Sequence, residues 1–120
     1  MVGPGCVIGG SREVPWEVAQ GIPKEGRADL QRYRPRPEDR AIWIEVDLGE
    51  CWLDDRSPID KVEVSEANET VTITVRAHRS GAGEDCLTLH PERVALDRPL
   101  GGRTLIDGHT GDAVAIEPRV

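Results

Sequence analysis

The sequence has no phenylalanine, one tyrosine and three tryptophans among its 120 residues, so aromatic side chains contribute little to its core. Valine, isoleucine and leucine must supply most of that core instead, and the β-branched residues among them favour strands over helices. No apolar run approaches the roughly 18 residues that a membrane-spanning helix requires. The composition therefore predicts a single domain rich in strands, with no transmembrane span.

The chain also has no excess of positive charge. Its net charge is −7 and its isoelectric point is about 4.9. Such a chain repels the phosphate backbone of nucleic acids, so we expect no nucleic-acid partner. The one basic cluster consists of Arg32, Arg34, Arg36 and Arg40 around Tyr33. Two prolines and the neighbouring Glu38 and Asp39 give this stretch the composition of a solvated linker.

The sequence lacks the motifs that carry chemistry. Its cysteines and histidines show no zinc-site spacing, and no Gly-x-Ser-x-Gly motif occurs. Two acidic groups lie in or beside predicted loops. One is Asp54, Asp55 and Asp60, and the other is Asp107, His109 and Asp112. Neither follows the calcium-loop pattern, and acidic residues at such places are typical of turns. We therefore expect no metal, no cofactor and no catalytic residues, with a small hydrolase using an acidic cleft as the alternative.

Strict alternation of apolar and polar residues is the strongest positive signal. Residues 41–48 alternate over a full strand, with Ile42, Ile44 and Val46 on one face and Trp43 on the other. Residues 60–77 alternate in the same way and predict a hairpin with a tight turn at Asn68-Glu69. In the register that places both apolar sets on one side, residues 66, 64 and 62 pair with 71, 73 and 75.

Short strands separated by turn residues continue to the end of the chain. They are predicted at 86–89, 94–97, 103–107 and 113–117, with breaks at His90-Pro91, Pro99 to Gly102 and Gly108 to Asp112. About seven strands result, which predicts an antiparallel immunoglobulin-like sandwich, with a small β-barrel as the alternative. Residues 1–38 are rich in glycine and proline and predict an irregular segment that covers the sheet, with a short strand near Val14–Val18. The core of the single domain is expected in residues 39–120.

Three cysteines bear on the cellular compartment. Cys51 and Cys86 flank the predicted hairpin, and we expect them to form a disulfide in an oxidising, extracytoplasmic environment. This bond closes a loop of roughly 36 residues and restricts the unfolded chain by about 3–4 kcal/mol. Cys6 follows a glycine, as at the cleavage point of bacterial lipoprotein signals, which suggests lipid attachment; the alternative is a free thiol. This chain contains no visible export signal before it.

The order of motifs also resembles a type of small exported actinobacterial protein, described mostly as hypothetical proteins or lipoproteins. The shared pieces are Cys51, Val62-Glu63-Val64 with Glu66, Val71-Thr72-Ile73-Thr74-Val75, Cys86, and the ending from Pro99 to Gly111, Pro-Leu-Gly-Gly-Arg-Thr-Leu-Ile-Asp-Gly-His-Thr-Gly. The resemblance covers about the last two thirds of the chain. It implies export and an uncharacterised role, and it supplies no catalytic residues.

Trp43 is the best candidate for a binding surface, because its strand turns it away from the core. Tyr33 is included with it, and the alternative is that the N-terminal segment covers Trp43. The sequence thus predicts a non-enzymatic binding or structural module at the cell surface, whose partner is a protein or a carbohydrate. Two copies could also associate through a sheet face or edge.

Overall fold

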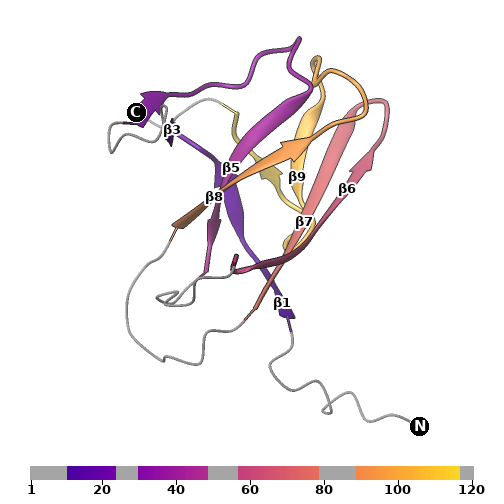
Figure 1. The fold of residues 1–120 in the computed structure, drawn as a ribbon. Coiled ribbons are helices and arrows are strands. Elements are labelled where there is room, and N and C mark those ends of the chain that lie inside the picture. Colours follow the sequence, from indigo (N-terminus) through magenta and orange to yellow (C-terminus); the bar gives the residue numbers. More distant parts are fainter. Residues whose placement is uncertain (1–10, 24–29, 49–56, 79–88, 117–120) are drawn as a thin grey trace, which may run out of the picture.

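The computed structural model describes residues 11–23, 30–48, 57–78 and 89–116, and every regular element in these ranges is a β-strand (Figure 1). The predicted all-β class is therefore confirmed. The strands are β1 Ser11–Val14, β2 Trp16–Val18, β3 Gly21–Pro23, β4 Leu30–Arg32, β5 Ala41–Asp47, β6 Ile59–Glu66, β7 Thr70–His78, β8 Leu89–Ala95, β9 Thr104–Asp107 and β10 Ala113–Val114.

Strand β7 is the centre of a curled, mixed sheet of five strands. One edge of β7 pairs with β6, while the other edge is divided between β1, antiparallel beside residues 75–78, and β9, parallel beside residues 70–73. β10 pairs with the outer edge of β9. The expectation of purely antiparallel pairing is wrong for β7 and β9. Their parallel pairing arises because the chain crosses to the other sheet as β8 before it returns as β9.

The hairpin β6–β7 has the register that the alternation predicts. Its turn lies at Asn68-Glu69, where the Ala67 N–H donates to the Thr70 carbonyl oxygen at 2.8 Å. Near the start of β6 the register shifts and Asp60 forms a bulge. The apolar side chains of β7 are fully buried, and a slip by one residue would turn them to water. The predicted pairs present are Val62–Val75, Val64–Ile73 and Glu66–Val71.

A second sheet has the antiparallel order β2-β5-β8. Along β5 buried and half-exposed residues alternate, as predicted. The predicted break at His90-Pro91 is wrong, because β8 continues through both residues. Proline is tolerated there since β8 pairs with β5 alone among the described strands, and the missing N–H falls on the open edge.

The region predicted to be irregular, residues 1–38, contains four of the described strands. β1 belongs to the five-stranded sheet and β2 to the three-stranded sheet, and Pro15 separates them. Proline has no N–H to continue a ladder, whereas its carbonyl oxygen accepts the Asp47 N–H at 3.0 Å. The single strand expected near Val14–Val18 is therefore two strands in different sheets. β3 and β4 form a separate two-stranded ribbon.

Side chains from both sheets form one hydrophobic core, built almost wholly from aliphatic residues. Of the aromatic residues that the structure describes, Trp16 is the one buried in this core, and its Nε1–H donates to the Ile73 carbonyl oxygen at 2.9 Å. This hydrogen bond joins β2 of one sheet to β7 of the other. Each fully buried aliphatic side chain contributes about 1.5–3 kcal/mol, so the core compensates for the absence of phenylalanine by number. Its largest fully buried members include Ile42, Ile44, Leu48, Ile73, Leu100 and Leu105.

The turn after β9 approaches β7 closely. The Gly108 N–H donates to the Ile73 carbonyl oxygen at 2.9 Å, so this oxygen accepts two hydrogen bonds. A Cβ at position 108 would overlap Thr74 Oγ1 and lie 2.9 Å from Thr74 Cβ. Glycine is therefore required here by contact. At Gly101 and Gly111, by contrast, the requirement is conformational, since their φ angles are +61° and +81°.

We expect Gly108→Ala to lower the free energy of unfolding by about 1–3 kcal/mol, because the added methyl group pushes the turn away from β7. Gly102→Ala is the matched control, since nothing lies within 4 Å of a Cβ there. Urea unfolding of both variants measures the difference. Equal stability of the two would contradict the close approach of Gly108 to Thr74.

Candidate functional site

Tyr33 and Trp43, the two residues predicted as a binding surface, lie on the wall of one groove of about 880 Å³. Tyr33 directly follows β4, and Trp43 lies at the centre of β5 among its half-exposed residues. We call this hollow the basic groove. Its remaining lining residues are Ile22, Arg32, Arg34, Pro35, Arg36, Pro37, Asp39, Arg40, Ala41 and Arg93.

A hydrogen bond ties the two aromatic residues together. The backbone N–H of Trp43 donates to Tyr33 Oη at 3.0 Å, and the Tyr33 N–H donates to the Gln20 carbonyl oxygen at 3.0 Å. Partial burial raises the pKa of the Tyr33 phenol above its ordinary value, while the Trp43 N–H acts in the opposite direction. The phenol is therefore neutral near neutral pH and fixed at the edge of β5.

The arginine-rich segment before β5 is anchored to the chain after β8. The Leu96 N–H donates to the Arg40 carbonyl oxygen at 2.7 Å, and the Leu100 N–H donates to that of Asp39 at 2.8 Å. A third bond joins the Gly101 N–H to the Pro37 carbonyl oxygen at 2.8 Å. The arginine side chains of this segment are exposed, as predicted, but its backbone is not that of a linker, because its carbonyl oxygens are bound by the loop after β8.

Positive charge is concentrated in the basic groove. Five of its lining residues are arginines, all exposed, and Asp39 is the only acidic residue among the described residues that line it. Asp39 Oδ2 accepts the Arg36 N–H at 2.9 Å and so closes a turn. Arg36 Nη1 lies 4.0 Å from Glu38 Oε2, but both side chains are about 70% exposed, and a pair of this kind is weak.

Arg93 is the residue of the groove that sequence reasoning missed. It pairs directly opposite Trp43 across β5 and β8. The sequence interpretation placed a break at His90-Pro91 and began the next strand at Val94, which left Arg93 in a loop. Treating residues 89–95 as one edge strand would have placed Arg93 on the same outward face as Trp43.

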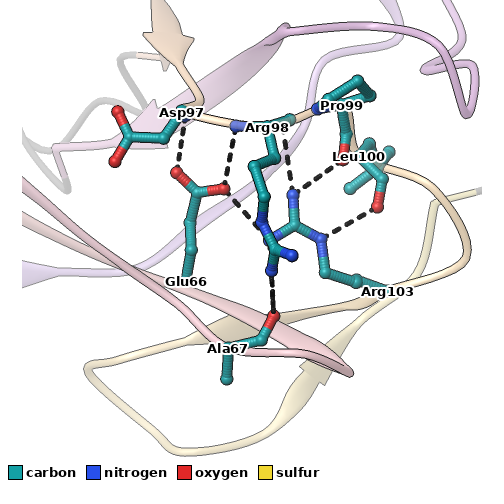
Figure 2. Close-up of polar contacts among 7 residues, drawn as sticks. All are labelled: Glu66, Ala67, Asp97, Arg98, Pro99, Leu100 and Arg103. Atoms are coloured by element: carbon teal, nitrogen blue, oxygen red, sulfur yellow. Dashed lines mark hydrogen bonds and ion pairs between the residues drawn. The ribbon is translucent and has the colours of Figure 1, made fainter.

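A second cluster, the Glu66–Arg103 cluster, lies at the turn end of β6 (Figure 2). Arg103 Nη1 is 3.0 Å from Glu66 Oε1, and the two side chains are only 7% and 12% exposed. Glu66 also accepts the backbone N–H groups of Asp97 at 2.6 Å and Arg98 at 3.4 Å. Arg103 donates to the carbonyl oxygens of Ala67, Arg98, Pro99 and Leu100.

Arg103 has no guanidinium donor left for a ligand. The five N–H groups of Arg103 match the five hydrogen bonds that it makes, all within the protein. The hydrogen bonds of the cluster instead connect the β6–β7 turn to the loop after β8. Figure 2 shows the Glu66 carboxylate directed at the backbone of Asp97 and Arg98, with Arg103 beside it.

A smaller cavity of about 210 Å³ lies beside β2, Tyr33 and the segment around β10. Asp107 and Asp112 are among its lining residues. Asp107 is buried, and its Oδ1 accepts the His109 N–H at 2.8 Å, which is the turn geometry expected of an aspartate before glycine. The Asp107 N–H donates to the Asp112 carbonyl oxygen at 3.0 Å. These contacts give Asp107 a structural role.

Of the acidic groups considered as calcium ligands, the structure describes Asp60, Asp107, His109 and Asp112. His109 Nδ1 lies 3.5 Å from Glu13 Oε1, and His78 Nε2 lies 3.4 Å from Asp60 Oδ1. Within the part of the chain that the structure describes, no three His, Cys, Asp or Glu side chains are placed to hold a metal ion. Asp54 and Asp55 lie outside the described residues. So do Cys6, Cys51 and Cys86, and the predicted disulfide and lipid attachment stay predictions.

Comparisons of the chain with protein-family models, with curated proteins and with solved structures found no match. Within the described ranges, no helical segment has the length and apolar character of a membrane span.

We expect the Glu66–Arg103 cluster to make stability depend on acid pH. The Asp97 N–H, followed by Arg103 and the Arg98 N–H, lowers the pKa of the Glu66 carboxyl below its ordinary value of 4.5 against the opposing effect of burial. Its pKa is thus lower in the folded than in the unfolded chain. The contribution of Glu66 is fully present above pH 4.5 and is lost as the pH falls through the folded-state pKa.

Urea unfolding from neutral to strongly acidic pH measures this dependence. Glu66→Gln should cost about 2 kcal/mol or more near neutrality, because it leaves Arg103 without its counter-charge, and the loss should shrink in acid. Glu63→Gln is the control, since that carboxylate is half-exposed and 3.9 Å from Arg76 Nε. A cost for Glu66→Gln that is independent of pH would contradict the assignment.

Proposed function

We propose that this protein is a non-enzymatic binding module at the cell surface, and that the basic groove is its binding site. The observation that carries the proposal is the convergence of Tyr33 and Trp43 in a groove of about 880 Å³. That volume lies within the range of about 300–1,000 Å³ that is typical of ligand sites. A half-exposed tryptophan at the centre of a strand provides a flat apolar surface beside polar groups, which suits a sugar ring or a peptide side chain.

For the fold we propose a variant of the immunoglobulin-like sandwich. Support comes from two sheets that share one core and from a hairpin with a well-specified register. The alternative is a small barrel, which the curl of the five-stranded sheet favours. In either arrangement the basic groove lies on the three-stranded sheet at one side of the core.

A second copy of the chain is less favoured as the partner. Among the edge strands of the described structure β6 and β8 are the longest, so they offer the longest edges for pairing between copies. However, β8 carries Pro91, and β6 carries a bulge at Asp60 followed by Lys61 and Glu63. Prolines, bulges and charges on edge strands discourage edge-to-edge pairing.

The alternative of a small hydrolase is supported by one feature, which is that Asp107 and Asp112 line the smaller cavity. Two observations count against it. The cavity, at about 210 Å³, is smaller than typical ligand sites, and the Asp107 carboxylate already accepts the His109 N–H.

The extracytoplasmic location is part of the proposal and rests on the expected Cys51–Cys86 disulfide and on the resemblance to exported actinobacterial proteins. In protein produced without lipid on Cys6, we expect intact-mass analysis of the unreduced, alkylated form to show one modified thiol, that of Cys6, and three after reduction. The disulfide should also raise the free energy of unfolding by about 3–4 kcal/mol relative to a Cys51→Ser and Cys86→Ser double variant. Three modified thiols before reduction would rule out the disulfide.

The binding proposal is tested with a panel of immobilised oligosaccharides and peptides. Trp43→Ala should weaken any specific binding by about tenfold or more, since a central aromatic contact is worth about 1.4 kcal/mol or more. Leu89→Ala is the control, because Leu89 is also exposed on this sheet, at 49%, but does not line the groove. If Trp43→Ala leaves every binding signal unchanged, the groove is not the site.

A further inference from the structure

We infer that the basic groove binds an acidic carbohydrate, with a sugar ring against Trp43 and the anionic groups of the sugar among the arginines. The inference rests on the proposed function and names the class of ligand. It is carried by the arrangement of one half-exposed indole beside five arginines in a protein whose net charge is −7.

The charge of the groove opposes that of the whole molecule. Among the described residues that line it, five are arginines and one, Asp39, is acidic, and Asp39 Oδ2 accepts a backbone N–H. Charges more than about 8–10 Å away are screened at physiological salt, so a small ligand in the groove is affected mainly by the arginines. A long polyanion such as a nucleic acid also meets the negative remainder of the surface. The groove therefore favours a short ligand with a few acidic groups.

The neighbouring positions of Trp43 and Arg93 suit a sugar better than a purely anionic group. These residues are direct partners across β5 and β8, so their side chains share the outward face of the sheet. An aromatic ring offers the CH face of a sugar an apolar contact, and a guanidinium beside it pairs with an acidic substituent on that sugar. The cations among the described lining residues are all arginines, whose planar, bidentate geometry matches a carboxylate.

An extended peptide finds less to bind beside Trp43, because both backbone groups of this residue are already paired. The Trp43 N–H donates to Tyr33 Oη, and the Trp43 carbonyl oxygen accepts the Ala19 N–H at 3.0 Å. Adding a peptide strand requires such groups to be free. Recognition therefore falls to the side chains of the groove, which suits a carbohydrate.

The test is isothermal titration calorimetry of the full chain with three probes. They are tetragalacturonate, the neutral tetramer made by reducing its carboxylates, and polyglutamate of similar charge. We expect tetragalacturonate to bind at least about tenfold more tightly than the other two and to weaken as salt is raised. A sulfated neutral tetramer that binds equally well would support the inference and assign recognition to charge rather than to the carboxylate.

Arg93→Gln and Arg40→Gln should each weaken tetragalacturonate binding by about tenfold, since each removes a charge-assisted contact. Lys61→Gln is the control, because it removes one positive charge from an exposed side chain on β6, outside the groove. Thermal unfolding verifies that each variant is folded. Unchanged binding by both groove variants would overturn the inference.

Other outcomes separate this inference from the proposed function. If the acidic and the neutral tetramer bind equally well and Trp43→Ala abolishes the binding of both, the preference for an acidic sugar is overturned. The proposal that the groove is a binding site then still stands. A DNA oligonucleotide is added as a further probe. If polyglutamate or the oligonucleotide binds more tightly than tetragalacturonate, the groove is assigned to a peptide or to a nucleic acid, and the inference is overturned. If neither tetramer binds while the panel shows another Trp43-dependent ligand, only the inference fails.

Discussion

The fold depends on how the hydrogen-bonding groups of β7 are shared. β6 takes one edge of this strand, and β1 and β9 divide the other, with Thr74 at the junction between them. Where the two partners meet, the Ile73 carbonyl oxygen accepts both the Gly108 N–H and the indole N–H of Trp16. A buried oxygen that satisfies two donors from distant parts of the chain fixes their positions, because each donor would otherwise be left unpaired in the core.

The shared edge explains why the N-terminal strands alternate between sheets. β1 can occupy only the half of β7 that β9 leaves open, so it ends after Val14, and Pro15 turns the chain to the opposite sheet. Trp16 then points into the core and bonds back to β7. The two sheets are thus joined by adjacent residues of one short segment, which gives a core without phenylalanine a polar contact at its centre.

The local alternation of apolar and polar residues was sufficient to predict strand pairing where the two paired strands are close in sequence. The β6–β7 register follows from period-two alternation on both sides of one turn, and the outward placement of Trp43 follows from the same rule. The order of strands could not be predicted in this way, because the β7–β9 pairing and the opposition of Trp43 and Arg93 join segments whose alternation is compatible with many partners. Pro91 led to the prediction of a break within β8, but an edge strand tolerates a proline that a central strand does not. Tyr33 and Trp43 could be named from sequence, whereas the anchoring that makes an arginine-rich stretch into a groove wall could not.

The Glu66–Arg103 cluster and the basic groove meet in one loop. Residues 96–101 donate to Glu66 through the N–H groups of Asp97 and Arg98, and to the groove segment through those of Leu96, Leu100 and Gly101. Arg103 binds the carbonyl oxygens of the same loop. The N–H groups of this loop are therefore hydrogen-bonded on both sides, to Glu66 and to the groove segment. These bonds fix the position of a loop that has no regular secondary structure. Arginine side chains lose entropy when they bind, so a fixed backbone beneath them reduces the remaining cost of ordering the site. The buried ion pair reaches no ligand itself, and under the proposed function its part is to hold in place the loop on which the groove segment rests.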